Sequence, residues 1–153
     1  MAKNRRYKDN RQNRDKGQFA LIPFVVMDSP GFIGLSSAAN KLLIDLVRQY
    51  NGGNNGYLCC CFSLMQKRGW KSKETLQKAK VELIKAGILV ETRKGGRPNR
   101  ASYYGLTWLA CNEQNGKTPL DINPQQFPRS LYLHPERYVN YLLSTDIVPV
   151  EGR

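Results

Sequence analysis

The sequence has few of the residues on which catalysis and membrane insertion depend. Its 153 residues include a single histidine, His134, and no carboxylate-rich or glycine-rich catalytic signature. We therefore expect a protein that is not an enzyme and that uses no cofactor and no metal. No apolar run approaches the roughly 20 residues of a membrane-spanning helix. The N-terminus is basic and polar, which does not fit a secretory signal, so we expect a cytoplasmic protein without a membrane partner.

Acidic residues are also scarce relative to basic ones. The chain holds 24 Lys and Arg against 12 Asp and Glu, a formal net charge of +12. Residues 1–18 contain seven basic and two acidic residues, and residues 63–100 contain eleven basic and three acidic ones. The remaining segments are close to neutral. The alternative is a solvated surface that keeps the protein soluble, but two separate basic segments favour a polyanionic partner.

The N-terminal half divides into an arm and the start of a folded domain. Residues 1–18 have too few apolar side chains to offset the entropy cost of ordering and are predicted to form a flexible basic arm. The apolar run Phe19–Met27 contains Pro23, which removes a backbone donor, so we predict an edge strand or extended segment. Residues 28–31 (Asp-Ser-Pro-Gly) are predicted to form a turn.

Two helices with clear boundaries are predicted in the centre of the chain. Ser36 or Ser37 begins the first, which has apolar residues at helical spacing as far as Tyr50. Ser72 begins the second, which runs to Ala86 and ends at Gly87. Between them we predict a reversing loop at 51–56, a short strand at 57–61 and a brief helix at 62–69. The second helix directs Leu76, Ala79, Leu83 and Ala86 inward and Lys73, Gln77, Lys78, Lys80 and Lys85 outward.

The C-terminal half is predicted to hold a hairpin and a tail. Residues 88–94 and 101–109 are predicted strands around a Gly/Pro/Asn loop at 95–100. Residues 110–153 are predicted to form an extended tail with a short helix near 135–143. This tail either packs back on the domain or docks on a partner. Its apolar stretch Leu131–Val150 is the surplus material available for a homodimer.

The order helix, strand, helix, turn, helix and hairpin resembles a winged helix-turn-helix. The segment from Gly69 to Leu89, with the pattern Gly-Trp-Lys-Ser-Lys-Glu-Thr-Leu-x-x-Ala-x-x-x-Leu-x-x-x-Gly-Ile-Leu, resembles the recognition-helix stretch of winged-helix regulators. Residues 19–109 together resemble a family of helix-turn-helix proteins of phages, prophages and plasmids, related to N-terminal domains of plasmid and phage replication proteins. The resemblance implies an α+β fold: a winged helix at 19–109, preceded by the basic arm and followed by an irregular tail.

The same resemblance implies sequence-specific binding of double-stranded DNA, in transcription regulation or DNA replication initiation of a phage or other mobile genetic element. The protein would then be nucleoid-associated, in the host cytoplasm if phage-encoded. Four groups of residues would contact DNA: Ser72, Lys73, Thr75, Gln77 and Lys78 in the major groove; Lys67, Arg68 and Lys71 on the backbone; Arg93, Lys94, Arg97 and Arg100 from the wing; and Arg5, Arg6, Arg11 and Arg14 from the arm. For each single residue, the alternative is surface solvation.

Other interpretations of the sequence remain open. The scaffold could instead be a protein-interaction module, for instance an anti-defence inhibitor or an adaptor in a nucleoprotein complex. Cys59, Cys60 and Cys61 are adjacent, so their side chains alternate in direction and do not form the usual zinc cluster; we expect small buried residues, with Cys111 the thiol to test for redox activity. The two tryptophans are candidates for base stacking, although core packing is preferred for Trp108. His134 is expected to be structural or on the surface.

Overall fold

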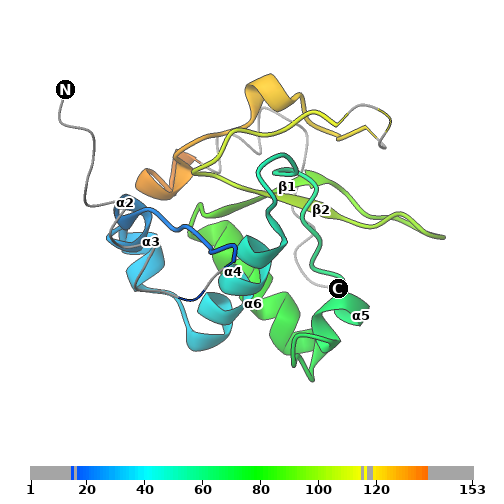
Figure 1. Cartoon of the computed structure of the whole chain (residues 1–153), viewed down its shortest axis with the longest axis horizontal. Helices are drawn as coiled ribbons and strands as arrows, with labels where there is room; N and C mark the ends of the chain where they lie inside the picture. The colour runs from blue at the N-terminus through cyan, green and yellow to red at the C-terminus, as the bar shows by residue number, and fades with distance from the viewer. Residues whose placement is uncertain (1–14, 16, 115, 117–118, 138–153) are drawn as a thin grey trace.

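The computed structural model of the chain describes residues 15, 17–114, 116 and 119–137, and it combines helices with an antiparallel sheet (Figure 1). This mixture of helix and strand is compatible with the expected α+β class. Most of the predicted arm (residues 1–14 and 16) and the part of the predicted 135–143 helix beyond Arg137 lie outside the described residues. The elements are α2 (Phe24–Met27), α3 (Pro30–Ile33), α4 (Ser37–Gln49), α5 (Phe62–Gln66), α6 (Lys73–Lys85), β1 (Leu89–Arg93), β2 (Tyr103–Leu106) and the 3-10 helices η1 (Pro124–Gln126) and η2 (Leu131–Leu133).

The segment before α4 is helical where the sequence suggested an edge strand and a turn. Pro23 stands directly before α2 and Pro30 is the first residue of α3, positions where the missing N–H of proline costs no helical hydrogen bond. The Ser29 side chain accepts a hydrogen bond from the Phe32 amide at 3.4 Å and donates one to the Val26 carbonyl at 2.6 Å. Val26 is fully buried. The two prolines therefore start short helices here, and the extended prediction for 24–27 is wrong.

Helices α4 and α6 form the body of the fold and agree with the sequence prediction. Ser36 caps α4 by accepting from the Ala39 amide, and Ser72 caps α6 by accepting from the Thr75 amide, each at 3.2 Å. The helices pack on each other. Glu82 of α6 also accepts hydrogen bonds from the Ser36 amide and hydroxyl at 2.6 and 2.7 Å. Helix α6 therefore fixes the position of the first turn of α4.

The predicted strand at 57–61 is reduced to a single bridge. Only Leu58 pairs with the hairpin, through Tyr104. The backbone groups of Cys59 are instead bound by the Gln49 side chain, which donates to the carbonyl at 2.8 Å and accepts from the amide at 2.9 Å. Because a side-chain amide takes the place of a neighbouring strand, the pairing does not continue.

The predicted hairpin is present, with shorter strands than expected. Strands β1 and β2 pair with Leu89 opposite Leu106, and a bulge interrupts the register between Glu91 and Arg93. The helix-facing side joins the main core with side chains that include Leu42, Leu46, Leu83, Leu89 and Leu106. The other face carries a second cluster of Val90, Ile122, Phe127 and Leu131.

The tail therefore packs back on the domain over the part that the structure describes. In Figure 1 the segment with η1 and η2 crosses the sheet on the side opposite α4 and α6. Two glycines allow this close approach. A Cβ on Gly87, which has a φ of +72°, would lie 2.6 Å from the Leu131 carbonyl oxygen, and one on Gly105 would lie 2.9 Å from the Phe127 ring. No described helix has the length and apolar character required to span a bilayer.

Candidate nucleic-acid interface

The turn between α5 and α6 is anchored to α4 by a buried carboxylate. Asp45 is 4% exposed and accepts from Trp70 Nε1 at 2.8 Å, Lys41 Nζ at 2.8 Å and Arg68 Nε at 3.0 Å. Lys41 also donates to the Arg68 carbonyl at 2.8 Å. Burial raises the pKa of Asp45, but the hydrogen bonds from Lys41, Trp70 and Arg68 outweigh it and hold that pKa below its ordinary value. Asp45 therefore sets where the turn lies relative to α4.

The sequence prediction missed this role of Asp45. Asp45 lies within the predicted helix that begins at Ser36 or Ser37, for which only apolar positions were assigned to the core. The structure buries Asp45 together with Leu42 and Leu46. Two features of the sequence could have indicated this role. Asp45 is an acidic residue among the apolar positions of its helix, and Trp70, in the turn before the next long helix, needs an acceptor for its N–H. Trp70 is also buried, at 6% exposure, so it is not presented to a base.

The outward side of α6 carries most of the residues predicted to enter the major groove. Leu76, Ala79 and Leu83 are buried, and the side chains on the opposite side reach solvent. The exposed set comprises Ser72, Lys73, Thr75, Gln77 and Lys78. Lys78 forms an i,i+4 ion pair with Glu74 at 2.8 Å, with both side chains more than three-quarters exposed. Lys73 Nζ lies 5.6 Å from the centre of the Phe62 ring. Lys73 has no ion pair with a described carboxylate.

The basic residues of the hairpin fall into two groups. Lys94, Arg97 and Arg100 are exposed at or near its tip, and Arg100 pairs with Asp121 of the tail. Arg93 is only 6% exposed and its guanidinium lies 4.4 Å from the centre of the Tyr103 ring. The sequence placed Arg93 among the wing contacts, but a buried side chain stacked on tyrosine is not presented at the surface. The bulge after Glu91 puts Arg93 opposite Tyr103 in the register.

The exposed cations come from two elements that follow one another in the chain. In Figure 1, α5 lies near the start of α6 below the sheet, and the tip of the hairpin extends to the right. Lys67, Arg68 and Lys71, in and just before the turn, are exposed as well. Arg68 uses one nitrogen on Asp45 and is 49% exposed. The predicted contacts Arg5, Arg6, Arg11 and Arg14 lie outside the described residues.

The four cysteines lie in different surroundings. Within the described residues no group of three or more His, Cys, Asp or Glu side chains is placed to hold a metal. Cys60 is buried, Cys59 and Cys111 are half-buried, and Cys61 is exposed, so the expectation of small buried residues holds fully only for Cys60.

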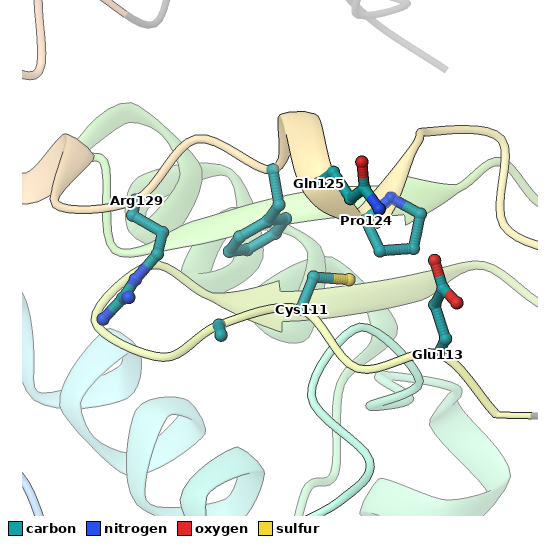
Figure 2. A pocket seen from close by; sticks show the side chains of 7 residues that line it. Cys111, Glu113, Pro124, Gln125 and Arg129 are labelled. Carbon is teal, nitrogen blue, oxygen red and sulfur yellow. The ribbon is translucent and has the colours of Figure 1, made fainter.

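Cys111 lies in a cavity of about 430 Å³ between the loop after β2 and η1 (Figure 2). Glu113, Pro124, Gln125 and Arg129 are among its other lining residues. Burial raises the pKa of the Cys111 thiol to about 11, which makes it a poor nucleophile at neutral pH. Trp108 is packed in the core, and His134 is exposed with Nδ1 3.2 Å from Glu136.

Comparison with models of known protein families, with curated proteins and with solved structures gave no match. The relation to phage and plasmid helix-turn-helix proteins therefore stays a prediction from the sequence.

Proposed function

We propose that this protein is a winged helix-turn-helix that binds double-stranded DNA through α6 and the β1–β2 hairpin. The observation that carries the proposal is the set of cations on the outward side of α6 and at the hairpin tip. Lys71, Lys73, Lys94 and Arg97 are exposed and have no ion pair with a described carboxylate. Uncompensated cations on two adjacent elements provide the charge that phosphate binding needs.

The fold features support this use of α6. The bridge from Leu58 to Tyr104 sets a third backbone segment beside β2, so the sequence order is helix, bridge, helix, helix and hairpin. That order is the one of a winged helix. With α6 as the reading helix, Ser72, Thr75 and Gln77 face the base edges, and Gln77 has the amide that pairs with adenine. Lys71, Lys73 and the hairpin cations hold the phosphates on either side.

The biological process follows from the family resemblance alone. On that basis, the DNA is an operator or a replication origin of a phage or another mobile element. Selection of bound duplexes from a random pool tests this part. A consensus sequence, with or without two half-sites, supports specific reading and gives the symmetry of the bound form. A pool that stays random after several rounds contradicts it.

The groove assignment has its own test. Lys78→Ala is expected to weaken binding to the selected site more than binding to random duplex, because the proposal assigns Lys78 to the major groove with Ser72, Thr75 and Gln77. Arg5→Ala and Arg6→Ala are expected to lower affinity for all sequences alike. If both changes rescale affinity uniformly, the assignment of α6 as the reading helix is wrong.

A second candidate function is a protein-interaction module. It is favoured by the apolar side chains that α2 and α3 leave in solvent: Phe24 is 81% exposed, Val25 52% and Ile33 72%. Large apolar groups gathered on short helices are typical of protein contact surfaces. The DNA affinity of the unmodified chain at low salt separates the two candidates, because an interaction module shows none. Substitution of Phe24 and Ile33 by Ser is then expected to leave the affinity of a DNA-binding protein unchanged.

A further inference from the structure

The thiol of Cys59 lies beside residue 61, whose own thiol is exposed. Cys60, between them, is buried. The Cys61 amide donates to Cys59 Sγ at 3.4 Å, so the Cys59 sulfur is folded back over residue 61. The two thiols also interact with each other.

Cys61 and Cys59 differ in their exposure to solvent and in the direction in which their surroundings shift the pKa of the thiol. Cys61 is exposed, and the Ser63 hydroxyl donates to its sulfur at 3.6 Å. Partial burial raises the pKa of Cys61, but the hydrogen bonds from Ser63 and Cys59 outweigh it and bring the pKa below its ordinary value. Burial raises the pKa of Cys59 to about 11 and that of Cys60 to about 12. A thiolate hydrogen-bonded by a hydroxyl and open to solvent is the reactive form of cysteine.

The position of Cys59 is fixed independently of its thiol. Gln49 of α4 binds both the amide and the carbonyl of Cys59, so the backbone of residue 59 is held against α4. Cys111, the remaining thiol, is half-buried in the cavity beyond β2 and has a raised pKa. The described structure therefore offers one accessible thiol with a second one directly beside it.

We infer that Cys59 and Cys61 form a modification site for hydroperoxides, in which Cys61 is the attacking thiol and Cys59 the resolving one. Cys61 gives up its proton to solvent, and its thiolate attacks the distal peroxide oxygen. An S–O bond forms and the O–O bond breaks, which leaves a sulfenic acid on Cys61; the departing alkoxide, or hydroxide from hydrogen peroxide, takes up a proton from solvent and leaves as an alcohol or water. The Cys59 sulfur then attacks Cys61 sulfur. The S–S bond forms, the S–O bond breaks, and hydroxide leaves with the Cys59 proton as water. Two thiols lose two electrons in total, and the peroxide takes them up.

The first test uses the unmodified full chain in its reduced form. Limiting iodoacetamide at neutral pH is expected to alkylate Cys61 about tenfold faster than any other cysteine. Hydrogen peroxide is expected to lower the intact mass by about 2 Da, the loss of two hydrogens, with Cys60 and Cys111 still open to alkylation after unfolding. Alkylation of Cys111 ahead of Cys61, or oxidation that consumes Cys60 or Cys111, overturns the assignment.

Variants separate the two roles. Cys59→Ser is expected to leave a sulfenic acid at Cys61 that dimedone traps, and Cys61→Ser is expected to slow oxidation about tenfold. Cys111→Ser is the matched control and is expected to form the disulfide at the wild-type rate. A Cys61→Ser protein that forms an intramolecular disulfide as fast as wild type contradicts the inference. The exposed position of Cys61 makes this variant a mild one for folding, and the alkylation rates in the unmodified chain decide the outcome without it.

Discussion

Positive charge has two different surroundings in this molecule. At the junction of α4 with the α5–α6 turn, Lys41 and Arg68 are paired with Asp45, which is buried and also binds Trp70. On the outward side of α6 and at the hairpin tip, Lys73 and Arg97 have no pairing with a described carboxylate. The first set belongs to the fold and positions the turn. The second set adds charge without an ion pair to a described carboxylate, so it is available to a ligand.

The largest effect is expected when the carboxylate of the first set, Asp45, is removed. Asp45→Ala leaves the buried Trp70 N–H without an acceptor, whereas Lys41 and Arg68 are about half exposed and can be rehydrated. We therefore expect a loss of about 2 kcal/mol in the free energy of unfolding, dominated by the orphaned indole donor. Urea unfolding of the purified variant measures it. A loss below about 0.5 kcal/mol, the range of ordinary surface substitutions, would show that this carboxylate does not organise the turn.

The second set is expected to behave in the opposite way. Lys71→Ala combined with Lys73→Ala should weaken binding to duplex DNA about tenfold at low salt while leaving the unfolding free energy within about 0.5 kcal/mol. The matched control is Arg48→Ala with Lys85→Ala, which removes the same charge from exposed positions on α4 and the last turn of α6. Equal losses of affinity in the two double variants would mean that net charge, and not the site, governs binding.

Acid is expected to weaken the interactions of Asp45 in the first set by protonating its carboxylate, whereas the second set contains no carboxylate that acid can protonate. The folded-state pKa of Asp45 lies below its ordinary value of 3.8. Its carboxylate therefore stabilises the fold at pH values above 3.8, and this contribution is lost as the pH falls through the lowered folded pKa. Unfolding free energies of wild type and Asp45→Asn should thus converge on acidification below pH 3.8. A difference that stays constant down to the lowest pH at which the protein folds would assign the effect to packing.

The smallest effect is expected at the ion pair on α6. Glu74→Gln removes a negative charge from the outward side and releases Lys78, so DNA affinity should rise about two- to threefold at low salt. Because both side chains are more than three-quarters exposed, stability should change little. Glu113→Gln, at the cavity beyond β2, is the control for the loss of one acidic residue. A rise in both variants would point to net charge alone.

The sequence was sufficient where local signals agree with tertiary packing. The caps at Ser36 and Ser72, the stop at Gly87 and the spacing of Leu76, Ala79 and Leu83 all predict what the structure has. Each is a property of one helix and its ends. The exposure of Lys73 and Gln77 follows from the same periodicity.

The features of the fold that the sequence did not predict depend on contacts between residues that are distant in the chain or in another element. Pro23 and Pro30 are compatible with a broken strand or with the start of a helix, and burial of Val26 decides between them. Gln49 stops the strand at Cys59 from a position ten residues away. The burial of Arg93 against Tyr103 follows from the bulge in β1. None of these contacts leaves a periodic trace in the sequence.

The salt dependence of binding tests the central claim most directly. The full chain is titrated with a random duplex across a salt series, and the triple variant Lys71→Ala, Lys73→Ala and Arg97→Ala is titrated in parallel. We expect the logarithm of the affinity to fall linearly with the logarithm of the salt concentration, by about 0.9 per phosphate contact, and the slope of the triple variant to be smaller by about that amount for each contact removed. Undetectable binding at low salt, or equal slopes for the two proteins, would contradict the assignment of α6 and the hairpin as the DNA-binding surface.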